Sequence, residues 1–146
     1  MVRKVLGVTG IRSEYDILYS PFRSIEQHPD LELAVIITGA HLADTFGYTE
    51  REIIKDGFPI VERIESLLDS DNQSSRAKSA SITLQGMIQT ISRIKPDLIL
   101  VAGDREEVLV SAIAGVYSNI PVAHIAGGDF GGLHVDDSVR DATTKL

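Results

Sequence analysis

Short apolar runs alternate with longer amphipathic stretches along the whole chain, and this alternation limits the fold more than any other feature of the sequence. The runs rich in aliphatic residues predict buried strands at residues 4–8, 33–38, 98–101 and 122–125, with a shorter strand allowed around residues 59–64. The amphipathic stretches predict helices at residues 13–27, 49–56, 74–94, 106–117 and 136–145. Strands and helices that alternate in this way form a parallel sheet with right-handed crossovers and helices on both faces. The predicted fold class is therefore α/β.

Composition and charge exclude several classes of protein. At 146 residues the chain has the size of one domain, predicted to span residues 1–146. The formal charge of −7, with no basic cluster longer than Arg3-Lys4, argues against a nucleic-acid or anionic-membrane surface. Cysteine is absent, which excludes disulfides and thiolate metal sites and favours a reducing, cytoplasmic compartment. The N-terminal apolar run is broken by Gly7 and Gly10 and is too short for a signal or membrane helix.

Polar residues follow the first predicted strand in the segment Thr9-Gly10-Ile11-Arg12-Ser13-Glu14-Tyr15. Gly10 allows a tight turn, and Ser13 can cap the helix that follows. Arg12 suits an anionic ligand because its planar fork can bind two oxygens, although a solvated loop cation is the alternative interpretation. The glycine and lysine spacings of a P-loop or of a dinucleotide fingerprint are missing.

The strand predicted at residues 98–101 carries no charge, yet it runs directly into Gly103, Asp104 and Arg105. A carboxylate and a guanidinium then stand at the carboxyl end of a parallel strand, which is where open α/β sheets hold ligands. The alternative is that Asp104 merely caps the next helix, because Asp is a favoured N-cap residue.

His41 follows the second long strand within Thr38-Gly39-Ala40-His41-Leu42. A histidine there can donate to a phosphate or act as an acid or base near neutral pH. A hydrogen-bonded structural histidine is the alternative.

Four glycines occur within six residues after the last predicted strand, at Gly127, Gly128, Gly131 and Gly132. They allow the backbone to approach a ligand closely, and Asp136 and Asp137 begin the next helix. A flexible loop with an N-cap carboxylate is the alternative. Histidine and aspartate in this segment invite a metal interpretation, but their spacing fits no compact ligand motif, so no metal is predicted.

These motifs, in this order, resemble the hydrolysing UDP-N-acetylglucosamine 2-epimerases of sialic-acid and nonulosonate synthesis. The resemblance spans nearly the whole chain. Its motifs are Thr9-Gly10-Ile11-Arg12-Ser13-Glu14-Tyr15, Thr38-Gly39-Ala40-His41-Leu42, Gly103-Asp104-Arg105, Gly127-Gly128-Asp129, and Asp136-Asp137-Ser138-Val139-Arg140 with Thr144-Lys145-Leu146.

The resemblance implies a glycosyltransferase-B-like architecture, in which a sugar nucleotide lies between two Rossmann-like lobes. These 146 residues look like the N-terminal lobe only, without the second lobe that holds most uridine and diphosphate contacts. The family reaction removes the proton at C2 and expels UDP, and water then adds to the unsaturated sugar with inversion at C2. It requires no cofactor for the elimination. A UDP-sugar substrate and a homo-oligomer are expected, and the lobe alone is expected to be inactive.

The resemblance also implies roles for individual residues. The expected catalytic acids are Asp104, Asp129 and Asp136, and the expected substrate-binding residues are Arg12, His41, Arg105 and Arg140. Two positions depart from the family pattern, because many relatives have Glu in place of Asp129 and some have Glu in place of Ala126. One extra residue within 130–134 leaves the local correspondence open by one position.

Several functions remain open at this point. UDP-N-acetylglucosamine is the first candidate substrate and a UDP-diacetamido sugar the second. A non-catalytic binding or oligomerisation module and a glycosyltransferase of the same architecture are the other hypotheses. Asp104 and Asp136 favour the epimerase, because a scaffold does not need acids at those strand ends.

Overall fold

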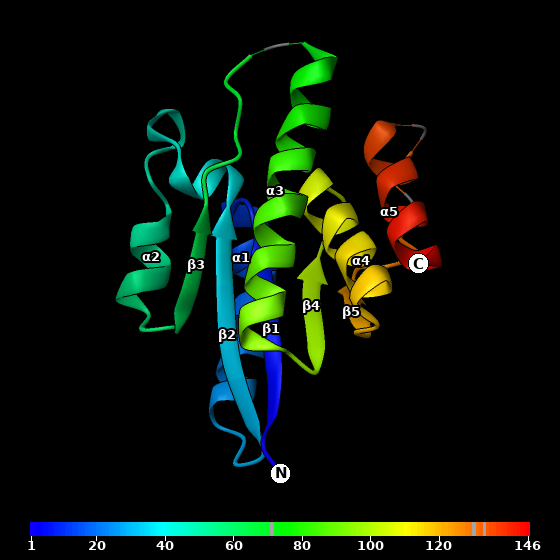
Figure 1. Ribbon diagram of the computed structural model, residues 1–146. Helices are drawn as coiled ribbons and strands as arrows, with labels where there is room; N and C mark the ends of the chain where they lie inside the picture. The colour runs from blue at the N-terminus through cyan, green and yellow to red at the C-terminus, as the bar shows by residue number, and fades with distance from the viewer. Residues whose placement is uncertain (71, 130, 133) are drawn as a thin grey trace.

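Five parallel strands form one sheet in the order β3-β2-β1-β4-β5 in the computed structural model, which describes residues 1–70, 72–129, 131–132 and 134–146 (Figure 1). The strands are β1 (Arg3–Thr9), β2 (Leu31–Thr38), β3 (Ile60–Ile64), β4 (Leu98–Ala102) and β5 (Val122–Ile125). Each ladder between neighbours is parallel, so the carboxyl ends of all five strands lie at one edge. This confirms the predicted α/β class.

The helices also agree with the sequence prediction to within one or two residues at their ends. They are α1 (Arg12–Glu26), α2 (Glu50–Lys55), α3 (Gln73–Ile94), α4 (Glu106–Ser118) and α5 (Val135–Lys145). Two short 3-10 helices that were not predicted, η1 (Gly39–Leu42) and η2 (Asp44–Phe46), follow β2. None of the helices in the described part of the chain has the length and apolar character needed to cross a membrane.

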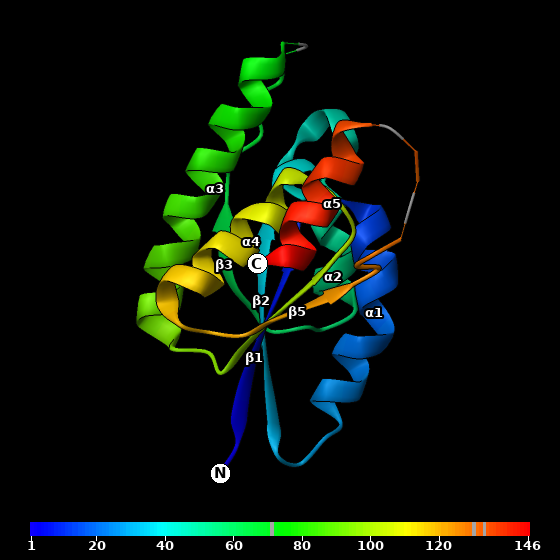
Figure 2. The same ribbon diagram turned by 90° about the vertical axis from the view of Figure 1, so that its right-hand side faces the viewer.

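Alternating side chains of the strands point to opposite faces of the sheet, and each face has its own core. Val5 and Leu33 point toward α1 and α2, whereas Leu6 and Val8 point toward α3 and α4. Figure 2 shows α1 on one side of the sheet and α3 with α4 on the other. The prediction of helices on both faces is therefore confirmed.

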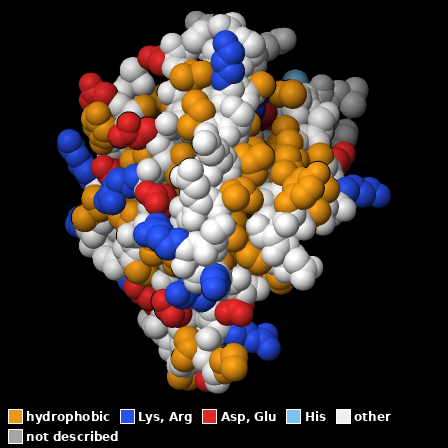
Figure 3. Space-filling model, viewed as in Figure 1, with side chains coloured by type: hydrophobic (Ala, Val, Ile, Leu, Met, Phe, Trp, Pro, Cys, Tyr) orange, Lys and Arg blue, Asp and Glu red, His pale blue; other side chains and the backbone are white. Residues whose placement is uncertain are grey.

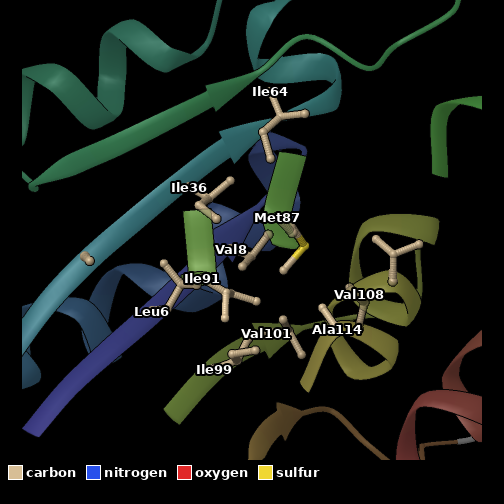
Figure 4. Close-up of a cluster of buried hydrophobic side chains, with 12 residues drawn as sticks. Leu6, Val8, Ile36, Ile64, Met87, Ile91, Ile99, Val101, Val108 and Ala114 are labelled. Carbon is tan, nitrogen blue, oxygen red and sulfur yellow. The ribbon is translucent and has the colours of Figure 1, made fainter. Parts of the chain in front are cut away.

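The apolar stripe of α3 provides much of one core. Met87 and Ile91 are buried among strand side chains such as Leu6 and Ile36 (Figure 4). The stripe was predicted to continue to Ala77, but Ala77 is exposed. The first turns of α3 extend beyond the strand ends (Figure 1), so no sheet lies beneath them.

The exposed end of this stripe belongs to an apolar groove along the seam between α3 and the α4–α5 pair (Figure 3). Its apolar lining residues are Ala77, Ala80, Leu109, Val110, Ile113, Val135 and Val139. Charged residues flank it at one end, where Arg76 and Glu106 lie.

Helix α1 packs unusually close to β1 in the opposite core. The ring of Phe22 is fully buried against Gly7, and a Cβ atom on Gly7 would lie only 2.3 Å from Phe22 Cε1. Gly7 therefore interrupts the apolar run of β1 because the aromatic ring occupies the space of a side chain.

Candidate active site

The carboxyl edge of the sheet carries all the site residues predicted from the sequence. They are Arg12 after β1, His41 after β2, Asp104 and Arg105 after β4, and Asp129, Asp136 and Arg140 after β5. Parallel strands place such positions along one crevice. The contacts among them differ from residue to residue.

Asp104 is held by an ion pair with α5. Arg140 Nη2 donates to Asp104 Oδ2, while Nη1 donates to Asp137 Oδ1 at 3.0 Å. The same Nη1 donates to the carbonyl oxygen of Asp129 at 2.8 Å. The N-cap residue of α4 is Arg105, so the alternative interpretation of Asp104 as a helix cap is wrong. One guanidinium thus connects the end of β4, the loop after β5 and the first turn of α5.

The two adjacent acids of α5 have different partners. Asp137 accepts the backbone N–H of His134 at 3.2 Å, and backbone hydrogen bonds, that of His134 first, lower the pKa of its carboxyl. Asp136 instead accepts Arg76 Nη2 at 3.0 Å. Asp136 lies at the carboxyl edge of the sheet as predicted, but the acid of this pair that contacts Arg140 is Asp137.

Arg76 joins three helices that are distant in the sequence. Its guanidinium donates to Glu106 Oε2 at 2.7 Å and to Asp136 Oδ1 at 3.0 Å, and these hydrogen bonds raise its pKa. The sequence analysis did not identify Arg76, because it lies 30 residues from its nearer partner and matches no motif. This bridge fixes α3, α4 and α5 beside the crevice.

Arg12 lies apart from the Arg140 network. Its side chain is 62% exposed, and its Nε atom is 3.6 Å from Glu52 Oε2 on α2. An exposed ion pair of this kind contributes about 0–1 kcal/mol, so its geometry is easily changed by a ligand.

His41 is fully buried, and its two ring nitrogens are both occupied. Nε2 shares a hydrogen bond with Thr9 Oγ1 at 2.9 Å, and Nδ1 shares one with Thr49 Oγ1 at 2.7 Å. Burial lowers the pKa of His41 to about 4, so the ring is neutral at pH 7. His41 therefore supports the ends of β1 and β2, in agreement with the alternative of a hydrogen-bonded structural histidine, and its contact with substrate stays a prediction.

His41 should also make stability depend on pH. Its folded pKa of about 4 lies below the ordinary value of 6.5, so its contribution is complete above pH 6.5 and is lost as the pH falls toward 4. We expect His41→Gln to lower the free energy of unfolding of the full-length protein by on the order of 1–3 kcal/mol at pH 7. The variant should also lack the loss of stability between pH 6.5 and 4 that His41 causes. Thermal melts between pH 4 and 7 test it, with the exposed His28→Gln as control. An identical pH slope in His41→Gln and the parent would contradict it.

Two acids that the sequence analysis did not select are buried at the base of the crevice. Glu14 and Glu107 are each 4% exposed. Glu14 Oε2 accepts the N–H of Gly10 at 2.7 Å in the turn before α1. The N-cap residue of α1 is Ile11 and no side chain caps it, so the predicted cap, Ser13, is wrong. Glu107 Oε2 is 3.6 Å from Arg105 Nε.

The family described as UDP-N-acetylglucosamine 2-epimerase matches residues 23–146. The chain belongs to this family. It is 38% identical over all its 146 residues to the UDP-N,N'-diacetylbacillosamine 2-epimerase (hydrolyzing) of Legionella pneumophila, of which it covers 38%. It is 34% identical to the UDP-N-acetylglucosamine 2-epimerase of Neisseria meningitidis, and that match covers 99% of this chain and 37% of that protein.

The fold comparison agrees. The crystal structure of UDP-GlcNAc 2-epimerase from Neisseria meningitidis bound to UDP-GlcNAc matches 96% of this chain with a TM-score of 0.80 and 22% identity. The match covers 38% of that structure, so this chain has the fold of the N-terminal lobe of a glycosyltransferase-B-like epimerase and spans well under half the length of its relatives.

Within this epimerase lobe, the loop after β5 is tied to the end of β4. His124 Nε2 shares a hydrogen bond with the carbonyl oxygen of Gly103 at 2.6 Å, and Nδ1 shares one with Thr144 Oγ1 at 3.2 Å. Within the part of the chain that the structure describes, no three His, Asp or Glu side chains are grouped to hold a metal ion. Three of the four glycines after β5, Gly127, Gly128 and Gly131, are exposed, and so is Asp129, which leaves this loop open to a ligand.

Proposed function

We propose that the full-length protein is a hydrolysing UDP-sugar 2-epimerase and that these residues form half of its catalytic crevice. The family match over residues 23–146 is the observation that carries the proposal. The geometry supports it, because carboxylates and guanidinium groups meet at the edge of the sheet where this fold binds ligands.

The reaction that we propose has two stages. The C2 proton of the sugar leaves as UDP is expelled, and water then adds to the unsaturated sugar with inversion at C2. Asp104 is the foremost proton-transfer group, because its carboxylate is partly exposed and Arg140 fixes its orientation. Asp129 and Asp136 are the further acids, and the contact between Arg140 and Asp137 makes Asp137 the alternative to Asp136.

The cations have separate proposed roles. Arg12 is exposed and can turn toward the diphosphate, and Arg105 lies beside Asp104 at the start of α4. Arg140 is only 13% exposed and both of its terminal nitrogens are engaged, so it acts by holding Asp104. No cofactor is needed for this elimination.

The sugar that we propose is a UDP-diacetamido sugar. The relative at 38% identity is named for N,N'-diacetylbacillosamine, whereas the relative named for N-acetylglucosamine is 34% identical. This reverses the order of the two candidates drawn from the sequence. We also propose a cytoplasmic homo-oligomer that supplies the synthesis of sialic-acid-like sugars. The absence of cysteine supports the compartment, and the apolar groove beside α3 supports association.

The test is UDP release by the purified full-length protein from each sugar nucleotide, without any acceptor. We expect kcat/KM for UDP-N,N'-diacetylbacillosamine to exceed that for UDP-N-acetylglucosamine about tenfold or more. UDP-N-acetylglucosamine lacks the second acetamido group, so it would leave polar groups of the site without hydrogen-bond partners. Residues 1–146 alone should release little UDP, because they lack the second lobe, which is expected to supply most of the uridine and diphosphate contacts.

Two results would contradict the proposal. UDP release that requires an added acceptor would indicate a glycosyltransferase. No release from either nucleotide by a folded full-length protein would favour the non-catalytic module.

A further inference from the structure

Glu14 and Glu107 form a buried acid pair that the proposed chemistry does not use. Each side chain is 4% exposed. Among the described residues, Glu14 Oε1 and Glu107 Oε2 are buried and have no hydrogen-bond partner. A buried carboxylate oxygen without a partner is costly, so each oxygen requires an explanation.

Both acids pack against the same loop residue. Glu14 Oε2 accepts the N–H of Gly10 at 2.7 Å. A Cβ atom on Gly10 would lie 2.6 Å from the carboxyl carbon of Glu107, and one on Gly39 would lie 2.5 Å from Glu107 Oε1. The glycines after β1 and β2 are therefore needed for the space that the Glu107 carboxyl occupies.

The surrounding charges do not balance two carboxylates. Arg105 is the nearest cation, with its Nε atom 3.6 Å from Glu107 Oε2, and Arg76 on α3 lies farther along the same side. Glu106 adds a further negative charge and already binds the guanidinium of Arg76. The nearby ring of His41 is neutral.

We propose that the Glu14–Glu107 pair holds one proton at neutral pH, and that this pair positions the Gly10 loop and Arg105 at the crevice. One retained proton reduces the buried charge of the pair to that of a single carboxylate beside Arg105. The acids are positioning residues, because they act through the loop and the guanidinium. Only the link to UDP binding rests on the proposed function.

The pH dependence has a defined sign. Burial, and then the charge of Glu107, raise the pKa of Glu14 to about 8, while burial also raises the pKa of Glu107. A folded pKa above the ordinary value of 4.5 gives stability that is present below pH 4.5 and lost as the pH rises through 8. Between pH 6.5 and 8.5 the titration of His41 is complete, so the acid pair can be followed there without it.

The experiment uses the full-length protein and three variants. Glu14→Gln and Glu107→Gln each replace one acid with an uncharged amide of the same size. Asp16→Asn removes an exposed carboxylate from the same helix and is the matched control. Infrared difference spectra at pH 7 report the carbonyl stretch of a protonated carboxylic acid, thermal melts from pH 6.5 to 8.5 report stability, and titration with UDP reports the crevice.

We expect the parent to show the protonated-acid band, and we expect this band to disappear above pH 8.5 and in Glu14→Gln. The parent's melting temperature should fall as the pH rises from 6.5 to 8.5, and its Kd for UDP should rise about threefold between pH 7 and 8.5. Glu14→Gln should lack both changes. Asp16→Asn should keep them.

The infrared titration of the parent decides the proposal even if a variant fails to fold. Absence of the band at pH 7 would overturn it, as would a band that survives in both Gln variants. The infrared and melting measurements need no sugar nucleotide, so loss of the proposed function alone would leave them unaffected. A further result would separate the two halves of the proposal. If the infrared band titrates but the Kd for UDP does not change with pH, the pair holds a proton and its positioning role is wrong.

Discussion

Asp104→Asn in the full-length protein is expected to lower UDP release about 100-fold or more while changing KM far less. Asparagine keeps the shape of the side chain at the end of β4 and can still accept from Arg140, but it cannot transfer a proton. A loss confined to kcat follows, because the removed group acts on the transition state more than on the bound substrate.

The control for this substitution is Asp141→Asn, which changes an exposed acid on α5 outside the Arg140 network. Steady-state kinetics and a thermal melt of both variants separate catalysis from folding. A near-normal kcat in Asp104→Asn would remove Asp104 from the proton-transfer step and assign it to Asp129.

Gly7→Ala is expected to destabilise the full-length protein by about 2–3 kcal/mol, because the new methyl group would overlap the buried ring of Phe22. Phe22→Leu alone should also destabilise, through the cavity left by the ring. The double variant should be more stable than the sum of the two effects predicts, by on the order of 1 kcal/mol, since the smaller side chain makes room for the methyl group. Urea unfolding measures all three.

Strict additivity of the two substitutions would contradict this account of β1. It would mean that Gly7 is present for a reason other than the close approach of α1.

The regular elements could be predicted because their signals are local. β5 spans residues 122–125 as its aliphatic run predicts, and α4 begins at Glu106 as predicted. Parallel pairing then placed the strand ends at one edge without further information. The family resemblance, whose motifs stand at those ends, was confirmed by the family match over residues 23–146.

The contacts within the site could not be predicted, because they join residues that are distant in sequence. Asp104 was predicted as a functional acid at a strand end, with a helix cap as the alternative, but its partner Arg140, 36 residues away, could not be foreseen. The structural alternative for His41 could be named from the sequence, but its two threonine partners could not. Glu107 was not selected from the sequence, and only the packing of two glycine-containing loops explains its burial.

The proposed chemistry is tested most directly by the product that the full-length protein forms in D₂O. Deprotonation at C2 followed by hydration predicts a free sugar that carries deuterium at C2 with inverted configuration, released together with UDP. A released sugar that keeps its original hydrogen and configuration at C2 would mean simple hydrolysis of the nucleotide and would contradict the epimerase function.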